Sequence, residues 1–206
     1  AARRWLAQRT VLGGEQQAAA APHPGLHRLK ARLRTHPTVE GALALERAHV
    51  VEGISIQDLA DLQGDWEVKS TKDGLRGWMS GDIMRILWGL YKSGFGGLRV
   101  LAGPRVAISA AGRVETQVDL QWGEHRDTVR FFSTLSFDGR KGGVLRLAPS
   151  AVRSNSLKVT IPLRLPAREL KVTFFDGEAL LLRDDRRGVV DALWRVGPAP
   201  PPAARR

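Results

Sequence analysis

Alternating apolar and polar residues run through the second half of the chain and predict a succession of short β-strands. The pattern is most regular from Leu165 to Val196, where it predicts three strands joined by two tight turns. Asp176-Gly177 marks the first turn, because glycine adopts the positive φ angle that a two-residue hairpin requires. The second turn is expected from Asp184 to Gly188. These three strands need upstream strands as pairing partners.

Further runs with the same period supply those partners. They span Gly64–Lys69, Val106–Ala110, Val114–Trp122, Val129–Phe137 and Leu157–Leu163. The fourth run slips out of phase near Ser133. Together with the final three, the runs give about eight or nine short strands at roughly even spacing. The sequence therefore predicts a mainly β fold, an antiparallel up-and-down barrel in which closure removes the exposed sheet edges.

Leucines at helical spacing predict a helical region before the first strand. Leu26, Leu29 and Leu33 recur on one face, and Pro37 interrupts the pattern because proline lacks the amide hydrogen that a helix needs. A second, shorter helix is expected from Ser55 to Leu62, with Ser55 as its N-cap.

These elements divide the chain into four parts. They are a flexible basic arm and linker (1–24), an N-terminal helical region (25–62), a β-barrel (63–197) and a Pro/Arg-rich tail (198–206). Within the barrel, the apolar segment from Ile83 to Tyr91 is compatible with either a lid helix or a strand.

The charge of the chain restricts its partners. Its 206 residues include 32 Lys and Arg against 21 Asp and Glu, for a net charge of +11. Such a balance favours an anionic membrane, an acidic protein or a nucleic acid. The cations do not interleave with aromatic residues on one strand, so we expect no nucleic-acid partner. The first predicted helix carries a basic face, which is either solvated or contacts a membrane or an acidic partner. That face comprises Arg28, Lys30, Arg32 and Arg34.

Catalytic and metal-binding motifs give no support to an enzyme. The chain has no cysteine, no Gly-x-Ser-x-Gly and no His-Glu-x-x-His. Carboxylates do cluster at the two predicted turns, at Asp176, Glu178, Asp184 and Asp185. Aspartates commonly cap turns by hydrogen bonding to the backbone, which explains this cluster without acid–base chemistry. We therefore expect a non-catalytic protein that needs no metal or cofactor.

A barrel of this size is either filled by side chains or holds one small ligand. The residues expected to face inward are apolar, so any ligand should be apolar and held by a few polar groups near the mouth. The expected lining comprises Trp66, Val118, Leu120, Trp122, Phe131, Val159, Ile161 and Phe174.

Two motifs resemble those of the plastid lipid-associated proteins, also called fibrillins or plastoglobulins, which are lipocalin-like. The run from Phe175 to Asp185, FDGEALLLRDD, resembles the C-terminal signature of that family, and Leu62 to Val68, LQGDWEV, resembles its first strand. Leu180 and Asp184 depart from the signature. The residues in step with the two motifs, which we expect to close the barrel, are Gly64, Trp66, Asp176, Glu178, Arg183 and Asp185.

The resemblance implies a lipocalin-like barrel at the thylakoid or plastoglobule surface of the chloroplast. It implies a bound isoprenoid, carotenoid or other lipid. The alternative is a structural peripheral subunit of a photosynthetic or other organellar membrane complex, with the barrel as a docking module beside photosystem or antenna subunits. In lipocalin-like barrels a first-strand tryptophan packs under an arginine from a late strand. Arg183 is the expected partner of Trp66, and Arg195 is the alternate.

Overall fold

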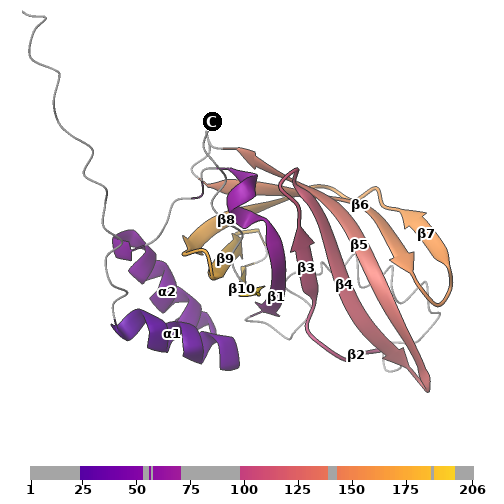
Figure 1. The fold of residues 1–206 in the computed structure, drawn as a ribbon, viewed down its shortest axis with the longest axis horizontal. Helices are drawn as coiled ribbons and strands as arrows, with labels where there is room; N and C mark the ends of the chain where they lie inside the picture. The colour runs from indigo at the N-terminus through magenta and orange to yellow at the C-terminus, as the bar shows by residue number, and fades with distance from the viewer. Residues whose placement is uncertain are drawn as a thin grey trace, which may run out of the picture.

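A computed structural model of the chain describes residues 24–52, 56, 58–70, 98–138, 143–186 and 188–197. Three predictions lie outside these residues: the flexible arm up to residue 23, the lid or strand from Ile83 to Tyr91, and the tail 198–206. The described residues form two helices beside a closed, mainly β barrel (Figure 1).

Eight antiparallel strands close the barrel, which confirms the prediction of a mainly β antiparallel barrel. Each strand pairs with its neighbours in chain order, and β1 pairs with β10 to complete the ring. The ring comprises β1 (Gly64–Ser70), β3 (Arg105–Ile108), β4 (Arg113–Trp122), β5 (His125–Asp138), β6 (Val144–Ser154), β8 (Arg168–Phe175), β9 (Ala179–Asp184) and β10 (Val189–Val196). Two short strands extend it, because β2 (Leu98–Val100) pairs with β4 and β7 (Val159–Pro162) pairs with β6.

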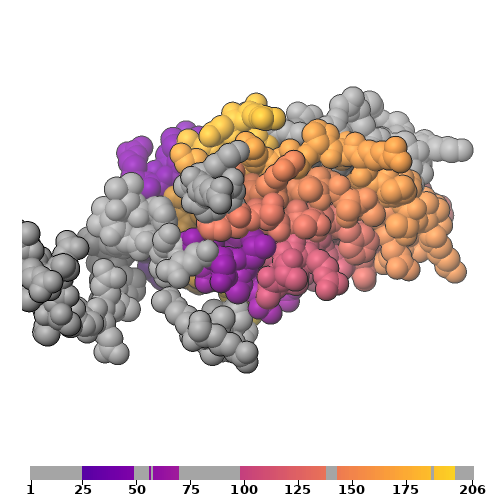
Figure 2. All heavy atoms as spheres, turned by 90° about the horizontal axis from the view of Figure 1, so that it is seen from above, coloured from indigo at the N-terminus to yellow at the C-terminus, as the bar shows by residue number. Residues whose placement is uncertain are grey.

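The antiparallel order gives the barrel two distinct ends. We call one the Trp66 end: it carries the start of β1, the end of β10 and the β8–β9 turn. We call the other the Arg168 end: it carries the start of β8 and the turns β4–β5, β6–β7 and β9–β10. In two perpendicular views, β7 and the adjoining parts of β4 to β6 lie at the part of the molecule farthest from the helices (Figures 1 and 2).

Helices α1 (Pro24–Thr35) and α2 (Val39–Glu52) pack on the outer face of β8, β9 and β10. They are separate helices, as the break at Pro37 predicts, and the Thr38 hydroxyl accepts a hydrogen bond from the Gly41 amide at the start of α2. The apolar cluster between the helices and the sheet comprises Leu33, Ala42, Leu45, Phe174, Ala179, Leu181, Val190, Ala192 and Trp194. Strands β8 to β10 are therefore covered on both faces, and this explains the nearly continuous apolar runs in β9 and β10.

Two irregularities change which side chains face inward. A register shift between Phe132 and Ser133 confirms the predicted slip in β5. A second shift, between Val172 and Phe174 in β8, was not predicted. This β-bulge turns Phe174 outward against the helices and places Phe175 in the barrel, so the prediction that Phe174 lines the interior is wrong.

The helix predicted from Ser55 to Leu62 is shorter than expected. A 3-10 helix, η1, spans Leu59–Leu62, and its N-cap is Asp58. The Asp58 side chain accepts the Ala60 amide at 2.6 Å, and Asp61 accepts the Asp58 amide at 3.2 Å. This reciprocal pair is a capping box, and it starts the turn at Asp58. Ser55, the predicted cap, lies outside the described residues.

Candidate functional site

Trp66 lies at the start of β1 and is fully buried. Its indole Nε1 donates a hydrogen bond of 2.9 Å to the carbonyl oxygen of Leu62, at the end of η1. The guanidinium of Arg195 lies over the ring, 4.2 Å from its centroid. The cation–π partner of Trp66 is therefore Arg195 from β10, the alternate of the sequence analysis, and the expected pairing with Arg183 is wrong.

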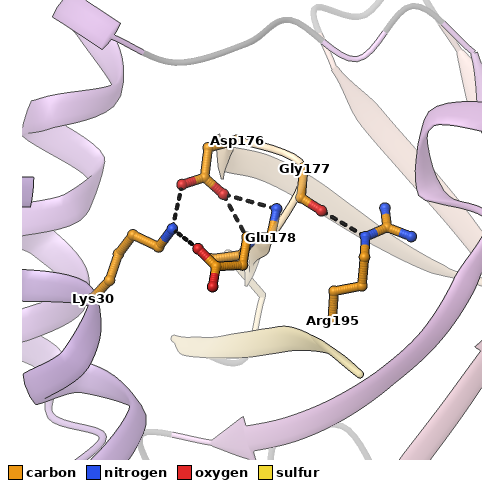
Figure 3. Close-up of polar contacts among 6 residues, drawn as sticks. Lys30, Asp176, Gly177, Glu178 and Arg195 are labelled. Carbon is orange, nitrogen blue, oxygen red and sulfur yellow. Dashed lines mark hydrogen bonds and ion pairs between the residues drawn. The ribbon is translucent and has the colours of Figure 1, made fainter. Parts of the chain in front are cut away.

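Arg195 also joins three pieces of backbone at the Trp66 end. Figure 3 shows one of these contacts, with Gly177. Its Nε donates to the carbonyl of Gly177 in the β8–β9 turn at 2.5 Å, and its Nη2 donates to the carbonyl of Asp61 at 3.1 Å. Its Nη1 donates to the carbonyl of Gln63. Burial lowers the pKa of Arg195 from its ordinary value, and the group remains a cation at neutral pH. One side chain thus ties η1, β1 and the β8–β9 turn together.

Gly64 leaves the space that Arg195 occupies. A Cβ atom at this position would lie 2.6 Å from Nη1 of Arg195, and the φ angle of Gly64 is +134°. Both the contact and the backbone conformation require glycine. The Gly-x-Trp pattern therefore has a local explanation, because the glycine admits the arginine that covers the tryptophan.

Lys30 of α1 contacts the other side of the same turn (Figure 3). Its Nζ donates to Asp176 Oδ2 at 2.8 Å and also to Glu178 Oε2. The other oxygen of Asp176 accepts the amides of Glu178 and Ala179, at 3.0 and 2.8 Å. Burial by itself lowers the pKa of Lys30, but the two carboxylates outweigh it and the pKa is raised. The prediction that Lys30 faces a membrane or partner is wrong, because it anchors α1 to the barrel.

The remaining predicted basic and motif residues separate into different places. Arg28, Arg32 and Arg34 are exposed, and Arg34 also lies over the ring of Trp194, 5.8 Å from its centroid. Arg183 faces the helices and forms an ion pair with Glu46 of α2. Asp185 is exposed in the β9–β10 turn. The C-terminal motif is therefore divided between the Trp66 end, the helix interface and the surface.

The predicted ligand-lining residues mostly face the interior. Val118, Leu120 and Phe131 are buried there, and Trp122 and Ile161 are partly buried beside them. Val159 is 41% exposed, so its assignment to the lining is wrong. Val159 pairs with Ser154 at the end of β6, next to the β6–β7 turn, whereas Ile161, two residues on, packs against the core.

Sequence reasoning missed the polar residues that face inward toward the Arg168 end. Arg168 donates from Nη2 to Asp184 at 2.9 Å, and both side chains are buried. Asp127 is buried and accepts hydrogen bonds from Ser154 Oγ and from the Ser156 amide. The alternation of the strands could have indicated them. Asp127 lies two residues before Val129, and Arg168 two residues before Leu170, so each shares the inward face of its strand.

The site is an apolar barrel interior with one closed end and polar groups near the other. Among the described residues, no group of three or more histidine or acidic side chains is placed to hold a metal ion. Neither described helix is long and apolar enough to cross a bilayer. Comparison with protein-family models, curated proteins and solved structures found no match for this chain.

Proposed function

We propose that the chain is a non-catalytic, lipocalin-like protein of the plastid lipid-associated (fibrillin) type that binds an apolar isoprenoid, carotenoid or other lipid. The observation that supports it most is the asymmetry of the barrel. Arg195 and η1 cover Trp66 at one end, whereas charged side chains face inward toward the other. A single small apolar ligand suits an eight-stranded barrel with such an interior.

The polar groups near the Arg168 end support a direction of binding. An apolar tail would lie among Val118, Leu120 and Phe131, which are buried in the interior. Its polar head would lie toward the buried Arg168–Asp184 pair. Apolar contact supplies the affinity and the polar groups fix the orientation. The resemblance to the fibrillin family implies a location at the thylakoid or plastoglobule surface of the chloroplast, and we propose that location for this protein.

The test is reconstitution with an isoprenoid quinone, followed by measurement of quenching of tryptophan fluorescence. Val118→Phe adds bulk to the interior, and Gln117→Phe adds the same ring to the outer face of the same strand. We expect Val118→Phe to weaken binding about fivefold or more, since the added ring overpacks the interior at a cost of ~1–3 kcal/mol, and Gln117→Phe to leave it unchanged. Circular dichroism confirms that both variants are folded. Equal binding by both folded variants, or no binding by the unaltered protein, would refute an interior lipid site.

A second candidate is a docking module in a membrane protein complex. The observation that favours it is the filling of the interior, where the largest fully buried side chains pack against one another. They include Trp66, Leu120, Leu145, Leu170 and Leu180. Purification from the native source separates the candidates. A stoichiometric isoprenoid in the organic extract supports the carrier, and a fixed set of photosystem, antenna or other membrane subunits without it supports the docking module.

A further inference from the structure

The β6–β7 turn is held in shape by a buried carboxylate. Asp127 accepts the Ser156 amide at 2.9 Å through Oδ1, and Ser154 Oγ donates to its Oδ2. Ser154 Oγ in turn accepts the Leu157 amide at 3.0 Å. The Ser156 hydroxyl donates to the carbonyl of Arg126 at 3.1 Å. The turn is therefore fixed to β5 by its side chains as well as by its backbone.

This fixed turn presents apolar side chains to solvent. Leu157 is 42% exposed and Val159, two residues on, is 41% exposed. Leu101, which is 45% exposed, lines one hollow together with Asn155 and Ser156 of the turn. Three of the described large apolar side chains that are most exposed thus lie in or beside one turn. That turn leads into β7, which lies far from the helices (Figure 1). We call Leu101, Leu157 and Val159 the apolar tip.

Cations surround the apolar tip. Arg126 lines the same hollow, Lys158 lies between Leu157 and Val159, and Arg153 is on the adjoining part of β6; all three are exposed. Among the neighbouring acids, buried Asp127 holds the turn, half-buried Asp119 accepts the Thr128 hydroxyl at 2.7 Å, and Glu124 of the β4–β5 turn is exposed. The three exposed cations outnumber the one exposed acid among these residues. Exposed apolar groups bordered by cations match the interface of an anionic bilayer, where the former enter the acyl boundary and the latter meet the headgroups.

The backbone at Lys158 is a further sign of this use. Its φ angle is +52°, the one positive φ among the described non-glycine residues. Glycine or asparagine adopts this conformation more easily. A lysine at such a position places a cation at the tip in spite of the backbone strain.

We propose that the apolar tip with Arg126, Arg153 and Lys158 docks the protein on an anionic lipid bilayer, with Leu157 inserted among the lipids. The inference extends the proposed function, because the tip lies at the Arg168 end of the barrel and docking would turn that end toward the membrane. It also places the membrane contact far from α1, the helix that the sequence analysis considered for this role.

The absence of cysteine from the sequence allows a direct test. Leu157→Cys is labelled with an environment-sensitive fluorophore, and Val39→Cys on α2, also 42% exposed in the native residue, is the matched control. The labelled proteins are mixed with vesicles of phosphatidylcholine alone or of equimolar phosphatidylcholine and phosphatidylglycerol. We expect a blue shift for the Leu157 label on the anionic vesicles, reversed by salt as the Debye length falls to ~3 Å at about 1 M. We expect none for the Val39 label.

Two unlabelled variants test the contributions separately by vesicle co-sedimentation. Leu157→Glu should weaken binding to anionic vesicles about tenfold through lost apolar burial and added repulsion, whereas Val39→Glu should not. Lys158→Gly relieves the strained φ angle and removes one cation, so it should weaken that binding about fivefold while the fold is retained.

The outcomes distinguish this inference from the proposed function. A shift of the Val39 label without a shift of the Leu157 label, or no binding to either vesicle, overturns docking by the tip. Binding to native membranes but to no lipid vesicle, if abolished by protease treatment of the membranes, would also overturn the proposal. It would show that the tip recognises an acidic membrane protein. These assays need no bound isoprenoid, so the two proposals can fail separately. Vesicle binding by a protein that fails the isoprenoid-binding test would refute the lipid carrier and leave the docking inference intact.

Discussion

Replacing Arg195 with methionine should be among the most destabilising single changes at the Trp66 end. Methionine keeps an apolar stem beside Trp66 but removes the cation and every donor. The side chain makes one cation–π contact and hydrogen bonds to the carbonyls of Asp61, Gln63 and Gly177. We take ~1 kcal/mol for the stacking and ~1 kcal/mol for each of the three hydrogen bonds, so the expected loss is about 4 kcal/mol.

Arg195→Lys separates the contribution of the charge from that of the guanidinium's hydrogen bonds. Lysine keeps the positive charge but lacks the planar fork that reaches several carbonyls at once, so about half the loss is expected, ~2 kcal/mol. The measurement is urea unfolding monitored by tryptophan fluorescence and circular dichroism, with the slope compared between variants. Arg146→Met on the exposed face of β6 is the control and should change stability by less than ~0.5 kcal/mol.

A double-mutant cycle isolates the contact with the indole. Trp66→Leu and Arg195→Met, made singly and together, should give a coupling energy of about 1 kcal/mol. Arg183→Met combined with Trp66→Leu should give none, because Arg183 pairs with Glu46 instead. A loss below ~1 kcal/mol for Arg195→Met, or a coupling that appears with Arg183, would show that the reasoning is wrong.

Two more perturbations test the neighbouring contacts. Lys30→Met should cost about 1–2 kcal/mol at neutral pH, mainly through Asp176, because Glu178 is 63% exposed and contributes little. Since the folded-state pKa of Lys30 is raised above 10.5, the stabilisation is complete below that pH and is lost as pH rises through the folded pKa, so the urea midpoints of the two proteins should converge as the pH rises above 10.5. Gly64→Ala should cost about 2–4 kcal/mol from its φ angle and its clash with Arg195. In the Arg195→Met background only the backbone part should remain, ~1–2 kcal/mol, and an undiminished cost would exclude the clash.

The sequence predicts the barrel because most of its strands have one buried face. In β4, Val114, Val118 and Leu120 keep strict period two with polar residues between them, and the strand is recognised from those letters alone. The Asp176-Gly177 turn is equally local, and Gly177 has the expected positive φ angle of +87°. Local patterns of this kind need no knowledge of the rest of the molecule.

The errors arise where a distant element decides the outcome. The bulge in β8 reverses the orientation of Phe174, and no residue of that strand predicts the bulge. The sequence does not decide whether Arg183 or Arg195 contacts Trp66. The packing of α2 on the outer face of the barrel determines that Arg183 pairs with Glu46 instead. In the sequence, Lys30 is one of several basic residues on a predicted helix. Only the fold shows that the β8–β9 turn lies beside it and supplies Asp176 as its partner. Tertiary contacts of long sequence separation carry information that periodicity does not.

The closing pair of strands also sets the order in which the barrel can be made. The first strand of the ring pairs with the last, and the Arg195–Gln63 hydrogen bond joins residues 132 positions apart. During synthesis β1 leaves the ribosome long before β10, so its pairing edge on that side stays open throughout translation of the intervening strands. Contacts of such separation slow folding, and an open edge invites pairing with other chains. Truncation within β10 should therefore yield aggregation rather than a smaller folded barrel, and a nascent chain of this protein has particular need of chaperones until its final strand emerges.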